Sequence, residues 1–142
     1  MTQLAAKIEP IAFSSALIID DHPLFCDALM MTLQSVAGLQ DIATAPCLQD
    51  ALPQLEQDPD LILLDLNLPD VQGLEGLKQL RRLTKAPILV ISSMADNRVI
   101  SAALHGGAAG FIPKHSQRDV FRAAVDALRR GERFLPAGYV LL

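Results

Sequence analysis

Short apolar runs alternate with amphipathic segments along the chain. Five runs have the length of a strand, at residues 16–19, 42–45, 61–64, 88–91 and 108–112. The first, third and fourth are apolar at every position, as in strands that are covered on both faces. Because strands that alternate with helices form parallel sheets through right-handed crossovers, the pattern predicts one α/β domain with a five-stranded, doubly wound parallel sheet.

The intervening segments have the spacing of amphipathic helices. The first helix is expected to open at Pro23 and to close at Gly38. Its predicted buried face consists of apolar or small residues at helical spacing, namely Phe25, Ala28, Leu29, Thr32, Leu33 and Val36. Residues 74–83 and 96–105 predict two more helices.

Two helix starts require separate attention. In residues 48–55, Pro53 removes a backbone donor, so this helix is expected to start late, near Asp50, or to be bent. The last helix is expected to open with a capping box at residues 116–119 and to end at residues 129–131. Its predicted buried residues are Val120, Phe121, Ala124, Val125 and Leu128.

The composition adds a cellular context. The chain has 142 residues, 51% of them hydrophobic, and a net charge of −4. Since the basic residues are dispersed, no duplex-binding surface is expected on this chain. Residues 1–14 make a poor signal peptide, and no apolar run reaches the roughly 18 residues of a membrane span. We therefore expect a cytoplasmic protein whose Cys26 and Cys47 are reduced.

Polar residues directly follow the predicted strands. Asp20 and Asp21 end the first strand, Asp65 the third and Ser92 the fourth, and Lys114 follows the fifth. Ligands of open parallel sheets bind at the carboxyl ends of the strands. Three carboxylates at that edge would repel one another without a cation, and such hard oxygen ligands favour Mg²⁺ over zinc.

The same residues suit phosphoryl transfer to the protein itself. A carboxylate can act as nucleophile while a metal and an ammonium neutralise the transferring oxygens and a hydroxyl donates a hydrogen bond. Asp65 is the expected nucleophile because it is the isolated carboxylate of a central strand. The adjacent pair, Asp20 and Asp21, is expected to hold the metal.

With these residues in place, the sequence resembles the receiver domain of bacterial two-component response regulators over about residues 15 to 131. The resemblance rests on Asp20-Asp21, on Asp65 to Asp70 with Gly73, and on residues 87–93 and 107–114. Residues 21–24 and 131–135 are similar to the NarL/FixJ (LuxR-type) subgroup, which carries a helix-turn-helix effector. The resemblance implies a flavodoxin-like fold with the strand order 2-1-3-4-5.

The resemblance also implies roles at the metal. A sensor histidine kinase would phosphorylate Asp65, which makes the chain a phospho-accepting signalling domain and not an enzyme. Asp21 and Asp65 would ligate Mg²⁺ directly, together with the backbone carbonyl of Asn67. Asp20 would act mainly through water.

Three further positions match the switch of that family. Ser92 matches the switch hydroxyl, Phe111 the switch aromatic and Lys114 the phosphate-binding lysine. Many receivers have a cis proline after this lysine, whereas His115 stands here, and a non-proline cis bond costs about 2.5–4 kcal/mol. The shape of the loop after the fifth strand therefore stays open.

The histidines are not expected to bind a metal. His22, His105 and His115 belong to different loops or helix ends. Although His22 is near the acidic residues, we expect it to be a surface residue at the start of the first helix.

Two alternatives compete with the phosphoacceptor function. A haloacid dehalogenase-type phosphatase or phosphotransferase also forms a phosphoaspartate, but it uses Asp-x-Asp, whereas Asn67 stands two residues after Asp65 and an amide cannot transfer the proton. The second alternative is a stand-alone receiver that serves only for docking.

The domain limits and the partners are expectations as well. We expect an N-terminal extension at residues 1–14, the receiver at 15–131 and the start of a linker at 132–142, with a DNA-binding domain beyond it. Weak homodimerisation is expected, preferably through the first and fifth helices, where Leu24 and Met31 lie off the main buried stripe. The surface of the fourth helix, fifth strand and fifth helix is the alternative.

Overall fold

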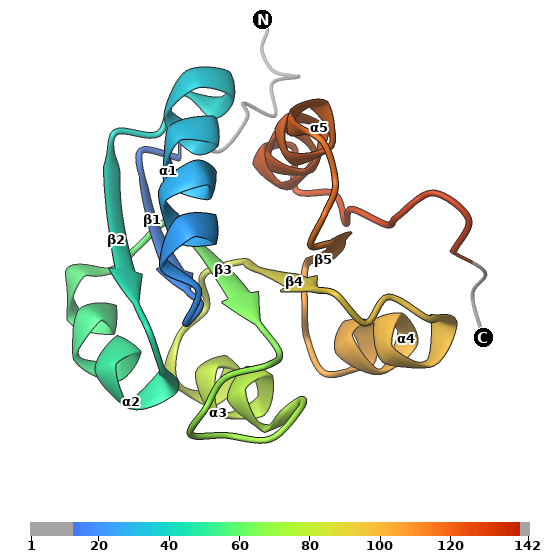
Figure 1. The fold of residues 1–142 in the computed structure, drawn as a ribbon, viewed down its shortest axis with the longest axis horizontal. Coiled ribbons are helices and arrows are strands. Elements are labelled where there is room, and N and C mark those ends of the chain that lie inside the picture. The colour runs from blue at the N-terminus through green and yellow to red at the C-terminus, as the bar shows by residue number, and fades with distance from the viewer. Residues whose placement is uncertain (1–12, 140–142) are drawn as a thin grey trace, which may run out of the picture.

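A parallel sheet forms the centre of the molecule (Figure 1). The computed structural model describes residues 13–139, and within them five strands are hydrogen-bonded in the order β2-β1-β3-β4-β5. The predicted doubly wound fold and strand order are confirmed. Because β1 and β3 are neighbours, the residues that follow them meet at one edge. The strands are β1 (Ser15–Ile19), β2 (Asp41–Ala45), β3 (Leu61–Asp65), β4 (Ile88–Ser92) and β5 (Gly110–Pro113).

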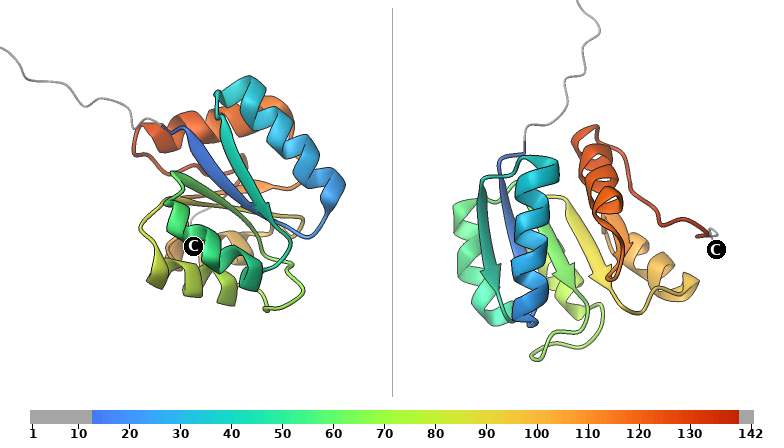
Figure 2. Two further views of the ribbon diagram at one scale, coloured as in Figure 1. Left: turned by 90° about the vertical axis from the view of Figure 1, so that its left-hand side faces the viewer. Right: turned by 45° about the horizontal axis from the view of Figure 1, so that its top comes forward.

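Helices cover both faces of the sheet (Figures 1 and 2). Alternate strand residues face opposite cores: Leu61 and Leu63 of β3 pack with α1 and α5, whereas Ile62 and Leu64 pack with α2, α3 and α4. Within the described part of the chain, no helix is long and apolar enough to cross a membrane. The helices are α1 (Pro23–Ala37), α2 (Leu48–Ala51), the 3₁₀ helix η1 (Leu52–Gln57), α3 (Glu75–Leu83), α4 (Asn97–His105) and α5 (Arg118–Arg129).

Helix α1 is rotated relative to the predicted buried face. Leu29 and Leu33 are buried as expected, but Ala28 is exposed. Cys26 and Ala37 complete the buried stripe in its place. The prediction was wrong here because two overlapping faces of this helix are both apolar, so that spacing alone does not choose between them.

Of the two expectations for residues 48–55, the late start is wrong, and the helix instead changes from α to 3₁₀ at Leu52, next to Pro53. Its first residue is Leu48 and not a residue near Asp50. The amides of Leu48 and Gln49 donate to the two carboxylate oxygens of Asp70, at 3.0 and 2.8 Å. Asp70, in the loop after β3, therefore caps the helix from another part of the chain. Pro53 is accommodated in the first turn of η1, where its missing donor costs little.

The predicted capping box of α5 is absent from the structure. Gln117 is the N-cap residue and makes no side-chain cap hydrogen bond. The Ser116 hydroxyl instead donates to the Pro113 carbonyl at 2.7 Å, within the turn that leaves β5. The buried stripe of Phe121, Ala124, Val125 and Leu128 is confirmed, while Val120 is half-buried.

The chain after α5 returns along the edge strand β5. The Phe134 amide donates to the Ala109 carbonyl, and the Phe134 carbonyl accepts from the Phe111 amide, both at 3.1 Å. Further on, the Tyr139 hydroxyl lies 2.8 Å from that of Ser101 in α4. Residues 132–139 thus link the edge of the sheet to α4. Residues 1–12, which include most of the predicted N-terminal extension, and 140–142 lie outside the described part.

Candidate functional site

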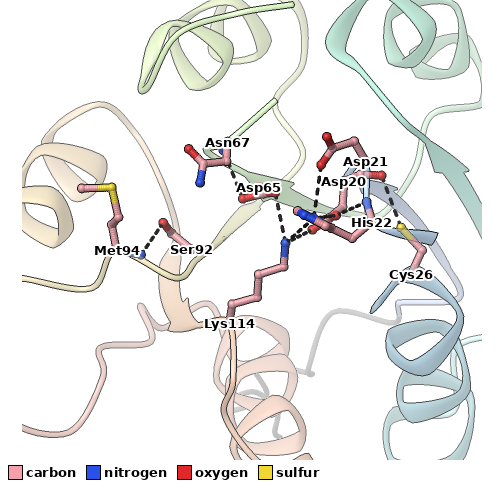
Figure 3. A network of polar contacts seen from close by, with 9 residues as sticks. All are labelled: Asp20, Asp21, His22, Cys26, Asp65, Asn67, Ser92, Met94 and Lys114. Atoms are coloured by element: carbon pink, nitrogen blue, oxygen red, sulfur yellow. Dashed lines mark hydrogen bonds and ion pairs between the residues drawn. The ribbon is translucent and has the colours of Figure 1, made fainter. Parts of the chain in front are cut away.

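Acidic side chains gather at the carboxyl end of the sheet (Figure 3). Asp20 follows β1 and Asp65 ends β3, and both are buried, with 4% and 3% of their surface exposed. The neighbouring Asp21 and His22 are exposed. Each of these four residues offers one potential ligand atom, and these atoms all lie within 4.8 Å of one another. We call this group the acidic cluster.

Lys114 lies at the centre of this group. Its Nζ is 2.8 Å from Asp20 Oδ2 and 3.2 Å from Asp65 Oδ2, and its side chain is only 9% exposed. It also lies 4.8 Å from the ring centre of Phe25 in α1. Burial acts to lower the pKa of Lys114, but its interactions with Asp20 and Asp65 outweigh burial and raise that pKa above its ordinary value. Lys114 therefore stays a cation.

The environment of Asp65 disfavours the ionised form of its carboxyl. Burial raises its pKa, and the charge of Asp20 adds to this effect. A hydrogen bond from the Asn67 amide and the charge of Lys114 act in the other direction without cancelling it. The ionised form of Asp65 thus lacks compensating charge, as expected where two buried carboxylates share one ammonium.

A hydrogen bond from a nearby backbone amide orients each of the two buried carboxylates. Asp20 Oδ1 accepts the His22 amide at 2.7 Å, and Asp65 Oδ1 accepts the Asn67 amide at 3.1 Å. Each side chain is therefore fixed by the backbone two residues ahead, and its Oδ2 faces Lys114. Asp20 Oδ2 is buried and accepts no hydrogen bond of good geometry, so the Lys114 ammonium neutralises it only as an ion pair.

This donor set fits a divalent cation. A buried carboxylate oxygen without a hydrogen-bond donor, next to two further carboxylates, requires positive charge beyond one ammonium. Carboxylate oxygens are the ligands that Mg²⁺ takes in proteins, usually with several waters. Asp20, Asp21 and Asp65, the predicted metal ligands, are brought together. The metal roles of these residues and of the Asn67 carbonyl stay predictions.

The two predicted switch residues are Ser92 and Phe111. Among residues 13–139, the structure shows no hydrogen bond between either of them and Asp65. Ser92 ends β4, is buried, and accepts the Met94 amide on its hydroxyl at 3.0 Å. Phe111 in β5 is fully buried in the core that contains α4. Their roles as switch residues stay predictions.

His22 is the residue that sequence reasoning set aside and the structure brings to the site. It is the N-cap of α1 and its side chain is 60% exposed, as expected. Its Nδ1 nevertheless lies 3.0 Å from Asp20 Oδ1, 3.2 Å from Asp21 Oδ1 and 2.9 Å from Lys114 Nζ. The only signal in the sequence was its place directly after the acidic pair.

The loop after β5 has an ordinary backbone. Every peptide bond among the described residues is trans, including the bond between Lys114 and His115. His115 is exposed in this loop, and His105 is exposed at the end of α4. Lys114 reaches the acidic cluster without a cis bond behind it.

Known proteins are similar to this chain in fold and in sequence. Residues 16–126 match the family model of the response regulator receiver domain. The glycerol metabolism activator of Pseudomonas putida is 37% identical over 123 residues, which are 84% of this chain and 56% of that protein. The chain spans about half the length of the curated relatives that it matches.

Two solved structures extend the comparison. A LuxR family DNA-binding response regulator from Silicibacter pomeroyi has a TM-score of 0.76 at 36% identity, covering 89% of this chain and 99% of that one. The signal receiver domain of the putative response regulator NarL from Mycobacterium tuberculosis has a TM-score of 0.75 at 28% identity, covering 88% and 100%. With the family match over most of its length, the chain belongs to the response regulator receiver family and is the receiver domain of a two-component response regulator.

Proposed function

We propose that Asp65 is the phosphoacceptor of this receiver and that a sensor histidine kinase supplies the phosphoryl group. The observation that carries the proposal is the environment of Asp65 Oδ2, which lies in a buried site 3.2 Å from Lys114 Nζ. In the transfer, the phosphorus–nitrogen bond of the phosphohistidine breaks and a bond from phosphorus to an Asp65 oxygen forms. Lys114 then neutralises charge on the phosphoryl oxygens.

Mg²⁺ is the proposed cofactor. Asp21 and Asp65 would hold it together with the Asn67 carbonyl, and Asp20 would act mainly through water. When bound, the ion supplies the positive charge that the transferring oxygens need. The charges of the acidic cluster support this assignment, because one ammonium serves two buried carboxylates.

Ser92 is the proposed sensor of the phosphoryl group. Its oxygen accepts the Met94 amide, and this leaves the hydroxyl proton free to donate. A phosphoryl oxygen on Asp65 would attract that proton and draw Ser92 towards β3, while Phe111 packs into the space that Ser92 leaves. Two packings of the region around α4 and β5 would then compete, and phosphorylation would bias them.

The output is proposed from the relatives. Several of them are transcriptional regulatory proteins by name, so we propose that the full-length protein controls transcription through a helix-turn-helix DNA-binding domain outside this chain. It would meet its kinase and its DNA in the cytoplasm.

Phosphorylation can be tested with a small donor. With acetyl phosphate and Mg²⁺, intact mass spectrometry should find one added phosphoryl group on the wild type and none on Asp65→Asn. Asp60→Asn is the matched control, because Asp60 immediately precedes the same strand and should leave the adduct unchanged. An Asp65→Asn protein that is modified at the wild-type rate would refute the assignment.

Two other outcomes would favour the alternatives. A wild type that takes neither phosphate nor beryllofluoride in the presence of Mg²⁺ would favour the docking receiver. Multiple turnover of a small phosphate ester, abolished in Asp65→Asn, would favour a phosphatase.

A further inference from the structure

His22 makes contacts that the phosphoacceptor function does not explain. Its Nδ1 lies 3.0 and 3.2 Å from carboxylate oxygens of Asp20 and Asp21. The same nitrogen lies 2.9 Å from the Lys114 ammonium. Figure 3 shows the imidazole next to these three groups, at the edge of the acidic cluster.

These contacts cannot all be favourable in the cation-free protein. If Nδ1 carries a proton, it donates to a carboxylate but opposes Lys114, which is a donor only. If Nδ1 carries a lone pair, it accepts from Lys114 but opposes the oxygens of Asp20 and Asp21, which are acceptors. A divalent cation at the acidic cluster removes this conflict, because the imidazole lone pair and the Asp21 carboxylate can then both be ligands, while Asp20 accepts from a water of the cation.

The spacing of these atoms also fits one coordination sphere. Neighbouring ligands in an octahedron with bonds of about 2.1 Å are about 3.0 Å apart. The separation of His22 Nδ1 from Asp21 Oδ1, 3.2 Å, is close to that edge. Asp21 and His22 thus present one oxygen and one nitrogen at a spacing that one cation can bridge.

We propose that His22 Nδ1 is a ligand of the divalent cation in this receiver and shifts its preference from Mg²⁺ towards later first-row transition ions such as Co²⁺ and Ni²⁺. Imidazole binds transition ions well and is a poor ligand for Mg²⁺, which prefers oxygen. The proposal rests on the cation site of the proposed function. It differs from that function in adding a nitrogen ligand and a metal preference.

Lys114 competes with the metal for His22. Its ammonium occupies the space between His22, Asp20 and Asp65, so a cation has to displace it from the imidazole. Removing the ammonium should therefore strengthen the binding of every divalent ion. Removing the imidazole should weaken transition ions selectively.

The nitrogen ligand can be observed directly. In untagged protein loaded with Mn²⁺, pulsed electron paramagnetic resonance should detect a coupling from a directly bound ¹⁴N nucleus. The coupling should be absent in His22→Phe and unchanged in His115→Phe, whose histidine is exposed in the loop after β5. Bound Mn²⁺ without nitrogen coupling in the wild type would overturn the proposal.

Calorimetry tests the preference. His22→Phe should lower the ratio of Co²⁺ affinity to Mg²⁺ affinity by about tenfold or more. Mutating a residue that only hydrogen-bonds to a metal ligand already changes metal affinity by about that factor. His115→Phe should keep the wild-type ratio, and thermal unfolding should show that both variants are folded.

The test separates this proposal from the cation site itself. Mg²⁺ binding that is lost in Asp21→Asn, with a ratio unaffected by His22→Phe, would refute the nitrogen ligand and keep the site. A wild type that binds neither ion would refute both.

Discussion

At the scale of the residue, the acidic cluster is a charge imbalance held in a fixed geometry. Asp20 and Asp65 are buried against one ammonium, and each is oriented by an amide two residues ahead. Such an arrangement is costly by itself, because the desolvation of the second carboxylate is not compensated. Because negative charge exceeds positive charge at this site, the acidic cluster favours the binding of a divalent cation.

The raised pKa of Asp65, caused mainly by burial, predicts a stabilising variant. A carboxyl whose pKa is higher in the folded than in the unfolded state favours folding below its unfolded pKa, and this contribution is lost as the pH rises through the folded pKa. Without divalent cations at pH 7, Asp65→Asn should therefore raise the free energy of unfolding by about 1 kcal/mol, or the midpoint by about 4 °C. Thermal unfolding between pH 4 and 8 should show the gain vanishing towards pH 4.

Asp60 lies at the other end of β3 and serves as a control, because its pKa is shifted in the opposite direction. Backbone amides of Ser14 and Ser15 donate to its carboxylate and lower its pKa. Its contribution to stability is present above the unfolded pKa and is lost as the pH falls through the folded pKa. Asp60→Ala should destabilise the protein at pH 7 and progressively less towards pH 3. Equal pH profiles for the two variants would contradict both assignments.

Chain order predicted which residues meet, but not how they are oriented. Asp20, Asp65 and Lys114 could be placed together because each lies at the carboxyl end of a strand of one parallel sheet, in the strand order that the family resemblance implied. The direction of His22 Nδ1 could not, because it depends on side-chain torsions and on the turn in which Asp20 accepts the His22 amide. The same holds for Ser116, whose hydroxyl turns back to Pro113 instead of capping α5.

At the scale of the element, Arg81 of α3 joins two loops at the opposite end of the sheet from the acidic cluster. Its guanidinium donates to the carbonyls of Thr84, Ala86 and Gly107, at 2.6, 2.8 and 3.1 Å. Gly107 has a φ of +102°, and a side chain there would meet Arg81 Cδ at 2.6 Å. The loop before β4 and the loop before β5 are therefore fixed to each other through one planar cation.

Replacing this cation predicts a clear loss of stability. Arg81→Leu should lower the free energy of unfolding by about 2 kcal/mol, because three half-buried carbonyls lose a charged donor. Arg81→Lys should recover little of the loss, since an ammonium lacks the planar fork. Urea denaturation measures both, with Arg82→Leu as the exposed neighbour on the same helix. A loss in Arg82→Leu as large as in Arg81→Leu would contradict a specific role for the three carbonyls.

The elements were predicted best where local sequence decides their limits. The runs predicted for β3 and β4 are apolar at every position, and each observed strand extends one residue further, to Asp65 and to Ser92. The predicted start of α2 was wrong because the observed start depends on Asp70, which is 22 residues away from Leu48. A cap supplied from such a distance leaves no signal near the helix it stabilises.

At the scale of the whole molecule, the surface of α1 is the strongest candidate for association. Leu24 and Met31 of α1 are 85% and 66% exposed. Helix α1 also lies beside α5 (Figure 2), with an open cavity of about 660 Å³ between them. Exposed apolar side chains that gather on one surface are typical of contact surfaces.

We therefore predict weak homodimerisation through α1 and α5 that beryllofluoride changes. In sedimentation experiments, Leu24→Glu should weaken association, because it places a charge at the centre of the contact. Ala102→Glu, at an exposed position of α4, should leave association unchanged. The opposite pattern would move the contact to α4 and β5, and a monomer at all concentrations would exclude a dimer of this chain.

The strand order also gives the two ends of the molecule different mechanical strength. A force on the amino-terminal side has to shear β1 from between β2 and β3, breaking two ladders at once. A force on the carboxyl-terminal side first opens the isolated bridge between Phe134 and Gly110, then detaches α5, and then peels off the edge strand β5, which is held by one ladder. Because forced unfolding is governed by its rate, a protease that pulls chains in from one end should degrade this receiver faster when it starts behind α5 than when it starts before β1.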